Sequence, residues 1–315
     1  MPTLRRAATI QRTTKRRATR RLALALALSF ASRGAAADEA APAPTNTTAV
    51  SEPVTPRVAL RFDPWIDGAV TLGLGAGVLT WGFLKPSLPE KTCTICDPAG
   101  SVNAFDATFR DWLVRPDIGP AETIGHVVSY GVSPAMGVAL TVGVAAADRR
   151  IDEAPANAVM VIEASLTAVV VKEALTYALP RERAEVHFAE GEAKQRAIDK
   201  QSDPLESFPS GHVLSIMAIT SSSAVIASMR GYRLAPMIWV AGSTLAVLAS
   251  YLRVAGDQHY MSDNLFGAAI GTGVGAAVPL LFHRPVGRGP APLGAARLGT
   301  SPVPGGRVVT VGWAF

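Results

Sequence analysis

Six apolar segments, each 17 to 26 residues long, constrain the fold of this 315-residue chain more than any other feature. Their composition, rich in Ala, Gly and Val with few charged residues, is typical of membrane-spanning helices. The segments are Gly68–Leu84, Thr123–Ala147, Ala154–Leu179, Val213–Met229, Leu234–Leu252 and Asn264–Phe282. We therefore predict an all-α fold, a bundle of six transmembrane helices. One alternative stays open, a soluble helical protein whose core helices are merely apolar.

Two of these segments carry informative glycine patterns. Gly267, Gly271 and Gly275 recur at four-residue spacing, so on a helix they share one face and let a neighbouring helix approach closely. Gly68–Leu84 is the shortest and most glycine-rich segment. It either spans the membrane, lies in its interface or re-enters, and the sequence leaves these alternatives open.

The start of the chain has the pattern of an export signal. Residues 1–37 contain nine Lys/Arg and no acidic residue, and they include the short apolar run Leu22–Phe30 and the small residues Ala35-Ala36-Ala37. This run is too short to span a bilayer, so we predict a cleaved signal peptide at 1–37. Thr19-Arg20-Arg21 also fits a twin-arginine signal, which leaves the export route open. Residues 38–64, rich in Ala, Pro and Thr, are predicted to be a disordered linker.

Removing the leader changes the charge balance. The whole chain carries a net charge of +5, whereas residues 38–315 carry 21 Lys/Arg and 25 Asp/Glu, a net charge of −4. The basic character therefore belongs to the leader, and no basic patch predicts a nucleic-acid partner. The oligomeric state is left undetermined by the sequence.

Three residues near the end of the fifth segment form the first chemical motif. His259 and Asp263 are four apart, so on a helix they share a face, and the carboxylate can accept the Nδ1–H of the imidazole. That bond leaves Nε2 as a free lone pair, which a histidine nucleophile requires. Arg253 supplies a planar fork suited to phosphate oxygens. The plain alternative is a helix-end histidine paired with a surface aspartate.

The second motif opens the fourth apolar segment. Ser210 follows a proline and is a predicted N-cap, so the first N–H groups of the helix can point at an anion. Gly211 lets a phosphate approach the backbone closely. His212 then stands in the first turn, where it can act as a general acid. An ordinary capped helix with an incidental histidine is the alternative.

Together these motifs resemble the type-2 phosphatidic acid phosphatase (PAP2) superfamily, which also holds bacterial acid phosphatases and vanadate haloperoxidases. Ser207 through His212 match the second family motif, and Gly256 through Asp263 follow the third, although Leu252 replaces the serine usual before its arginine. The resemblance favours the bacterial membrane phosphatase branch. It covers residues 65–283 as one domain and leaves residues 284–315 as a C-terminal tail.

The first family motif departs from its pattern, which is a lysine, six residues and then arginine-proline. Arg183 matches the arginine, but Thr176 stands at the lysine position and Ala184 replaces the proline. Lys172 lies one helical turn before Thr176, so its flexible stem can reach the same phosphate. Alternatively, Lys172 snorkels at a membrane boundary.

The resemblance implies a phosphoric monoester hydrolase that needs no metal and no cofactor. His259 would be the nucleophile that forms a phosphohistidine, His212 the general acid, and Asp263 the partner of the nucleophile. The phosphate ligands would be Arg253, Arg183, Ser210, Gly211 and Lys172. The implied substrate is a lipid phosphate, with phosphatidate, a polyprenyl diphosphate and lipid A phosphate indistinguishable. The alternatives are a soluble periplasmic acid phosphatase, a vanadate haloperoxidase, or a non-catalytic membrane protein that binds lipid phosphates.

Loop charges predict the orientation in a bacterial inner membrane. If all six segments span, the motif-bearing loops 85–122, 180–212 and 253–263 fall on one side. Loops 148–153 and 230–233 fall on the other side, each with two arginines, which the positive-inside rule places in the cytoplasm. The site would then face the periplasm. A cleaved leader predicts the inverse, because the mature N-terminus would start outside; we follow the loop charges.

Four further residues are candidates of lesser weight. Cys93 and Cys96, the only cysteines, are predicted to form a small disulfide in an exported loop. His126, inside an apolar run, is expected to be a packed polar residue. His187 is expected to be a solvated loop residue, although a place at the substrate entrance stays open.

Overall fold

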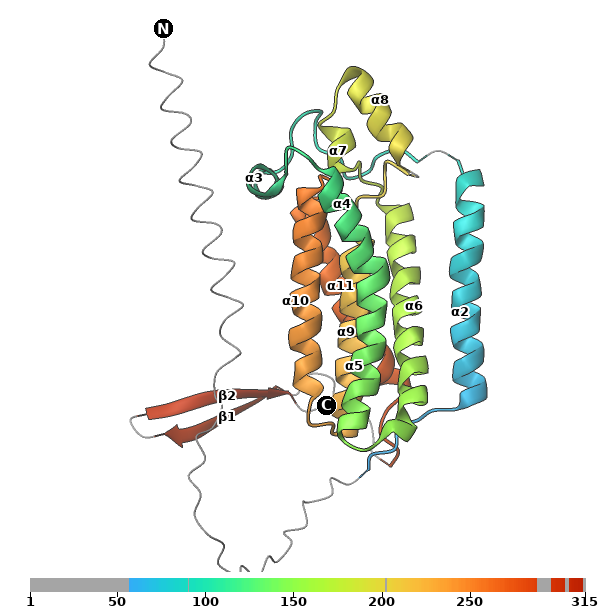
Figure 1. The fold of residues 1–315 in the computed structure, drawn as a ribbon, viewed down its shortest axis with the longest axis vertical. Helices are drawn as coiled ribbons and strands as arrows, with labels where there is room; N and C mark the ends of the chain where they lie inside the picture. The colour runs from blue at the N-terminus through green and yellow to red at the C-terminus, as the bar shows by residue number, and fades with distance from the viewer. Residues whose placement is uncertain (1–56, 90, 202, 288–295, 304–305, 314–315) are drawn as a thin grey trace, which may run out of the picture. The chain divides into compact units, whose positions relative to one another are not determined.

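The computed structural model describes residues 57–89, 91–201, 203–287, 296–303 and 306–313. The predicted signal peptide and most of the predicted linker lie outside these residues. Six long helical stretches form the bundle (Figure 1): α2 (Pro64–Leu84), α4 (Gly119–His126) continued through the π-helical η2 (Val127–Val132) into α5 (Ser133–Ala147), α6 (Ala154–Ala178), α9 (Gly211–Arg230), α10 (Ala235–Ala255) and α11 (Met261–Phe282). Shorter helices lie in the connections: η1 (Lys85–Ser87), α3 (Ala104–Leu113), η3 (Ile151–Glu153), α7 (Ala184–His187) and α8 (Gly191–Lys200).

The prediction of six apolar helices is confirmed. In the described part of the chain, six helical stretches are long and apolar enough to cross a membrane, and each overlaps a predicted segment within a few residues. Large apolar side chains also cover the outside of the bundle; Leu72 is 75% exposed and Phe83 is 82% exposed. Water would penalise such a surface, whereas lipid matches it. The chain is a multi-pass membrane protein.

Local sequence signals set where the helices begin and end. The Asp63 carboxylate accepts from the backbone N–H groups of Trp65 and Ile66, and Pro64 occupies the first position of α2, where no N–H is required. Helix α9 ends at Gly231, whose φ of 75° lies in the left-handed region that a glycine adopts without strain.

Helix α9 is the central helix, and the glycine face of α11 packs against it. A Cβ atom at Gly267 would lie 2.6 Å from the Ser210 carbonyl oxygen, and one at Gly271 would collide with the Leu214 carbonyl oxygen. These glycines therefore bring the two helix backbones into direct contact, as predicted from their spacing. The contact matters for function because α9 carries His212.

Helix α2 is a full-length helix at the edge of the bundle, and its main neighbour is α6 (Figure 1). Trp81 donates from Nε1 to Glu173 on α6 over 3.0 Å, and its ring meets that of Tyr177 edge to face. Gly68–Leu84 is thus part of a helix that is long and apolar enough to span a membrane.

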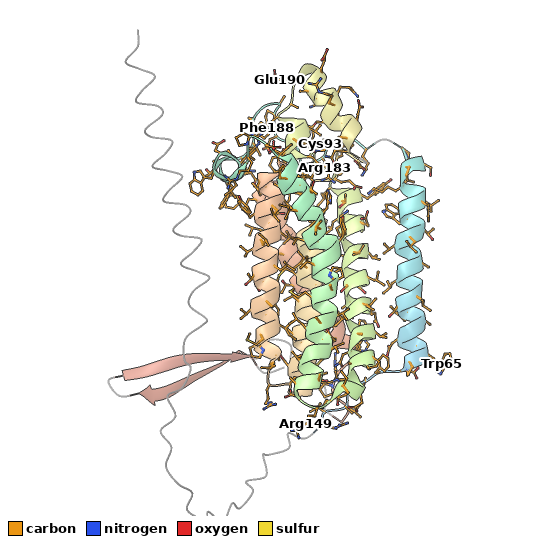
Figure 2. All side chains as sticks on the ribbon, viewed as in Figure 1. Trp65, Cys93, Arg149, Arg183, Phe188 and Glu190 are labelled. Carbon is orange, nitrogen blue, oxygen red and sulfur yellow. A yellow bond between two sulfur atoms is a disulfide. The ribbon has the colours of Figure 1, made fainter. Side chains whose placement is uncertain are left out.

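The motif-bearing loops gather at one end of the bundle. Cys93 and Arg183 lie at that end, together with α3, α7 and α8, whereas Trp65 and Arg149 lie at the other (Figure 2). The two arginine-containing connections, 148–153 and 230–233, share the second end. The chain is therefore polarised, with the candidate chemistry at one end and the two arginine-containing loops at the other.

The tail departs from the all-α prediction. Strands β1 (Ala296–Val303) and β2 (Gly306–Trp313) form an antiparallel hairpin, with Ala296 opposite Trp313 and Val303 opposite Gly306. The alternating pattern of the last residues has the period of two that a strand requires. The sequence analysis left residues 284–315 as a tail without assigning strands to it.

Candidate active site

His259 lies in the connection between α10 and α11, one residue before the cap of α11. Its Nδ1 is 2.7 Å from the Ser207 carbonyl oxygen. Because a carbonyl oxygen can only accept, Nδ1 carries the proton and Nε2 keeps its lone pair. Two predictions are therefore wrong: His259 does not stand on a helix with Asp263, and its Nδ1 lies 4.0 Å from that carboxylate without a hydrogen bond.

Asp263 instead forms hydrogen bonds with the loop segment that orients His259. One carboxylate oxygen accepts from the Ser207 hydroxyl over 2.6 Å and from the Tyr260 backbone N–H over 3.1 Å. The other accepts from the Arg181 guanidinium over 2.6 Å. Asp263 is fully buried. It thus reaches the imidazole through Ser207, whose hydroxyl it binds and whose carbonyl orients the ring.

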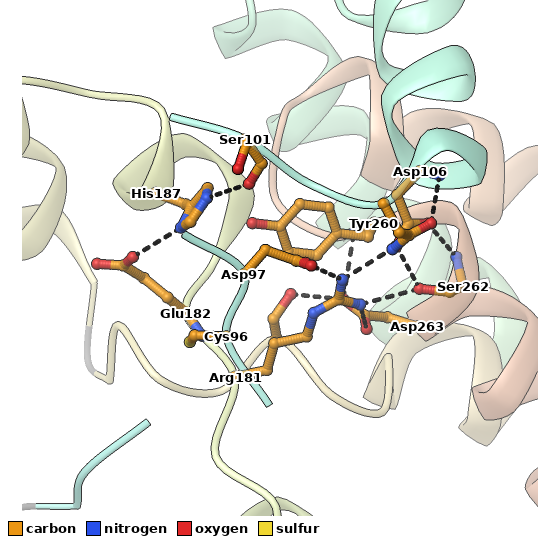
Figure 3. A network of polar contacts seen from close by, with 12 residues as sticks. Cys96, Asp97, Ser101, Asp106, Arg181, Glu182, His187, Tyr260, Ser262 and Asp263 are labelled. Atoms are coloured by element: carbon orange, nitrogen blue, oxygen red, sulfur yellow. Dashed lines mark hydrogen bonds and ion pairs between the residues drawn. The ribbon is translucent and has the colours of Figure 1, made fainter. Parts of the chain in front are cut away.

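Arg181 is the centre of this network, and the sequence analysis did not single it out. Its guanidinium donates to Asp263 and, over 3.0 Å, to Asp106, and it lies 3.9 Å from the Tyr260 ring centroid (Figure 3). Burial alone would raise the pKa of Asp106, but hydrogen bonds from Ser262, Asn103 and Arg181 outweigh it and lower that pKa. Arg181 therefore joins α3, the 180–212 loop and the start of α11.

The electrostatics favour a neutral His259. Burial is the main cause that holds the pKa of His259 well below its usual range, and the guanidinium charges of Arg253 and Arg183 lower it further. At neutral pH the imidazole therefore presents an unprotonated Nε2. A buried neutral imidazole beside two cations is suited to attack an electrophile that carries negative charge.

Of the two predicted phosphate arginines, Arg253 is buried and Arg183 is partly buried, and neither forms an ion pair with a carboxylate among the described residues. Arg253, in the last turn of α10, is 1% exposed, and its Nε and Nη1 have no hydrogen-bond partner among the described residues. Arg183 donates from Nε to the Asp203 carbonyl oxygen over 3.3 Å, and within the described residues it forms no ion pair. A buried cation without a counter-charge is costly. An anion placed beside the pair would offset this cost.

Helix α9 begins at Gly211, with Ser210 as its N-cap residue. The predicted capping bond is absent: within the described residues the Ser210 hydroxyl caps no backbone N–H, and it is buried without a hydrogen-bond partner. Its oxygen is thus free for a ligand. The backbone N–H groups of the first helical turn point out of the helix at the same place.

Lys172 reaches this turn. A Cβ atom at Gly211 would lie 3.3 Å from the Lys172 Cε, so the lysine stem packs over the glycine. The ammonium group pairs with Glu173 over 2.8 Å. Thr176, at the family lysine position, is fully buried, and its hydroxyl donates to the Phe208 carbonyl oxygen over 3.1 Å. The Lys172 side chain therefore lies beside the Ser210–Gly211 turn. Thr176 stabilises the preceding loop through its hydrogen bond to the Phe208 carbonyl.

His212 faces both His259 and a third histidine. The ring centroids of His212 and His259 are 6.2 Å apart, and the His212 Nε2 is 3.3 Å from the His126 Nδ1. Tyr130 packs against both His212 and His126, with centroids 4.9 and 5.9 Å away. His126 ends α4 just before the π-helical turn, a distortion often found at functional sites. The sequence analysis treated it as a packing residue, because no local pattern links it to His212.

The two remaining candidates lie in the loops above the site. The prediction that His187 is solvated is wrong: the ring is buried, with Nδ1 3.0 Å from Glu182 and Nε2 2.7 Å from the Ser101 carbonyl oxygen (Figure 3). Cys93 and Cys96 form the predicted disulfide. The His187 contact with Ser101 fastens the 85–122 loop to the 180–212 loop, and the disulfide closes a short turn within the 85–122 loop.

Part of the chain matches a known protein family. The family model of the PAP2 superfamily matches residues 157–286, a range that includes Lys172, Arg183, His212, Arg253 and His259. Residues 157–286 are thus similar to members of the PAP2 superfamily. No curated protein matches the chain at a significant level. Among solved structures, it is similar to a transmembrane PAP2-type phosphatidylglycerolphosphate phosphatase from Bacillus subtilis, with 17% identity and a TM-score of 0.38, over 69% of this chain and 94% of that one.

Proposed function

We propose that this PAP2 protein hydrolyses a lipid phosphate through a phosphohistidine at His259, with the chain's own cations in place of a metal. The observation that carries the proposal is the set of unpartnered groups around that imidazole. Arg253 and the Ser210 hydroxyl are buried and keep donors without partners in the described part of the chain. A phosphoryl group would satisfy them together.

In the first step, His259 Nε2 attacks phosphorus. A P–N bond forms as the bond from phosphorus to the leaving oxygen breaks, and His212 donates a proton to that oxygen. The Nδ1–H of His259 continues to donate to the Ser207 carbonyl oxygen, which stabilises the positive charge that develops on the ring. The two ring centroids are 6.2 Å apart, so both imidazoles can act on one phosphoryl group.

In the second step, the unprotonated His212 takes a proton from water, and the water oxygen attacks phosphorus. The P–N bond breaks, inorganic phosphate leaves and His259 is regenerated. Arg253, Arg183 and the Ser210–Gly211 turn bind the equatorial oxygens in both steps. These fixed donors stabilise the transition state more than the ground state, which is how they lower the barrier.

Lys172 is proposed to complete this set of phosphate ligands. Its stem already packs on Gly211, so only the end of the side chain must turn from Glu173 toward a phosphate. A flexible lysine suits this role, since it acts as a point charge without a fixed angle of approach. In this proposal Lys172 takes over the task of the lysine that is missing at Thr176.

The substrate class follows from where the site stands. It lies at one end of six apolar helices, so an amphiphile can keep its acyl or prenyl chain in the lipid while its phosphate enters between α9 and α10. Phosphatidate, polyprenyl diphosphate and lipid A phosphate all fit this description. We further propose that the protein resides in a bacterial inner membrane with the site facing the periplasm, because the arginine-containing loops share the opposite end.

The proposal is tested by phosphate release from a panel of these lipid phosphates, with purified protein in detergent and EDTA present. Turnover should persist with chelator, and orthovanadate should inhibit by occupying the pocket as a transition-state-like oxyanion. His259→Ala, purified in parallel, is the control for contaminating phosphatases. Activity that disappeared with chelator and returned with magnesium would overturn the metal-independent mechanism.

A second candidate function, binding of lipid phosphates without turnover, is favoured by one observation. Thr176 stands where the family carries a lysine, and its hydroxyl is committed to the Phe208 carbonyl. A binding protein would retain lipid phosphate and vanadate at the site yet release no phosphate from any member of the panel. Equilibrium binding measured beside turnover separates the two functions.

A further inference from the structure

A second cluster of polar residues lies toward the end of the bundle away from the active site. Asp67 on α2, Glu163 on α6 and His283 just after α11 each offer one ligand atom, and these atoms all lie within 4.8 Å of one another. Helix α11, 22 residues from Met261 to Phe282, separates His283 from the catalytic loop by about 33 Å. The cluster is therefore independent of the phosphatase site.

His283 is oriented as a ligand would be. It is 1% exposed, and its Nδ1 lies 3.1 Å from the Arg61 carbonyl oxygen, which can only accept. Nδ1 therefore carries the proton, and the Nε2 lone pair faces Glu163 Oε2 at 3.5 Å. Histidines that bind metals usually donate their other N–H to a carbonyl or carboxylate in this way, which fixes the tautomer.

Glu163 supplies a buried carboxylate whose ion-pair neighbour among the described ionisable side chains is His283. Its side chain is 8% exposed, and within the described residues it pairs with no lysine or arginine. Glu163 Oε2 and His283 Nε2 both lack a hydrogen-bond partner there. Asp67 adds a second negative charge, so even a protonated His283 would leave the cluster negative. A divalent cation bound to a neutral imidazole and two carboxylates would bring the net charge to zero.

The spacing of the Glu163–His283 pair agrees with metal coordination. Two ligand atoms bound tetrahedrally at 2.0–2.2 Å lie about 3.3–3.6 Å apart, which matches the 3.5 Å between Glu163 and His283. One imidazole nitrogen with two carboxylate oxygens suits borderline first-row ions, Zn²⁺ above all. We propose that Asp67, Glu163 and His283 bind one divalent transition-metal ion, best matched by Zn²⁺.

The bound ion would act as a structural clamp. Helix α2 has α6 as its main neighbour, and the ion would tie it both to α6 and to the end of α11. The chain already closes there through backbone contacts, with Arg61 N–H donating to the Arg284 carbonyl and Val286 N–H to the Ala59 carbonyl. The ion therefore stabilises the fold and takes no part in phosphoryl transfer.

The test measures metal content and thermal unfolding of the full-length protein in detergent. After chelation and removal of the chelator, wild type should bind one Zn²⁺ per chain. Its unfolding midpoint should rise by roughly 5 °C or more at Zn²⁺ a hundredfold above Kd. Glu163→Gln and His283→Gln should lose both effects. Asp152→Asn, which removes an exposed carboxylate paired with Arg57 near the same end, should retain both.

Three outcomes would overturn the proposal: no stoichiometric Zn²⁺ in wild type, equal binding in the variants, or the same thermal shift without the ligands. A simple imidazolium–carboxylate pair between His283 and Glu163 predicts the first. If both variants fail to fold, Asp67→Asn on the peripheral helix α2 tests the site instead. This substitution should weaken Zn²⁺ binding at least tenfold. Unchanged affinity in that variant would refute the site. Turnover per folded molecule should not depend on Zn²⁺.

Discussion

Asp263→Asn separates the observed geometry from the one that the motif spacing predicts. The substitution removes one negative charge from a fully buried position whose carboxylate binds Arg181, Ser207 and the Tyr260 N–H. Removing one partner of a buried ion pair typically costs about 3–5 kcal/mol. Arg181 keeps its 3.0 Å contact with Asp106, so we expect the lower end, about 3 kcal/mol.

The expected effect on catalysis is smaller than a direct partner would give. Where an aspartate binds the catalytic imidazole directly, replacement by asparagine lowers kcat about 10⁴-fold. Here Nδ1 donates to the Ser207 carbonyl, and an amide oxygen at position 263 can still accept from the Ser207 hydroxyl. We therefore expect kcat to fall less than about 10²-fold, the loss of one remote charge, with KM nearly unchanged.

The assay combines thermal unfolding in detergent with steady-state turnover, measured well below both unfolding midpoints. Asp106→Asn is the matched control, because it also removes a buried carboxylate from Arg181 but has no contact with Ser207. It should lose similar stability and keep a nearly normal kcat. A fall of 10⁴ in kcat at wild-type stability for Asp263→Asn would refute this reasoning and restore the direct pair.

Four further outcomes are expected. Lys172→Ala should cut turnover about 10²–10³-fold in well-folded protein, whereas a membrane anchor would lower expression and leave the rate per molecule unchanged. Gly271→Ala should reduce stability by at least 1–3 kcal/mol and turnover with it, since its Cβ meets backbone, whereas Gly273→Ala meets no atom within 4 Å and should be nearly neutral. Because the pKa of His259 is depressed, the unfolded chain takes up a proton near pH 6.5 that the folded protein does not. Stability should therefore decline below about pH 6.5, and His259→Gln should flatten that decline. After reduction, Cys93 should react with an impermeant maleimide from the periplasmic face, and labelling only after the inner membrane is breached would reverse the proposed orientation.

The bundle could be predicted because lipid imposes a simple rule on sequence. A helix that crosses a bilayer needs a long apolar run, and six such runs correspond to the six long helical stretches. The glycine face of α11 could also be predicted, because residues spaced four apart lie on the same face of a helix. The motif residues were predictable as a set, because the loops that carry them share one end.

The partner of His259 could not be read from spacing alone. The rule that residues four apart share a face holds only within a helix, and α11 begins at Met261 with Tyr260 as its cap. His259 therefore lies beyond the helix, where the 180–212 loop supplies the Ser207 carbonyl. Ser207 and His259 are 52 positions apart in the sequence. Their contact depends on tertiary packing, and no local sequence pattern encodes it.

The same limit explains the other omissions. Arg181 and Asp106 meet across 75 positions, and His126 and His212 across 86. His126 also depends on the π-helical turn that follows it, which no residue pattern in Val127–Val132 announces. Glu163 and His283 each stand alone in sequence and become a pair only when α6 and α11 pack. Chemistry built from distant single residues is visible only in the folded structure.

The most direct test of the central claim is quenching in alkaline SDS, which denatures the protein and preserves a phosphohistidine, during turnover of a lipid phosphate labelled with ³²P. Wild type should trap a phosphoenzyme that is labile to acid and stable to base, as a phosphohistidine is, with the label on His259. His259→Ala should form none. His212→Ala should form it slowly from a lipid phosphate but nearly normally from a nitrophenyl phosphate, whose leaving group needs no proton. Normal phosphoenzyme in His259→Ala, or turnover in wild type without any trapped intermediate, would contradict the account.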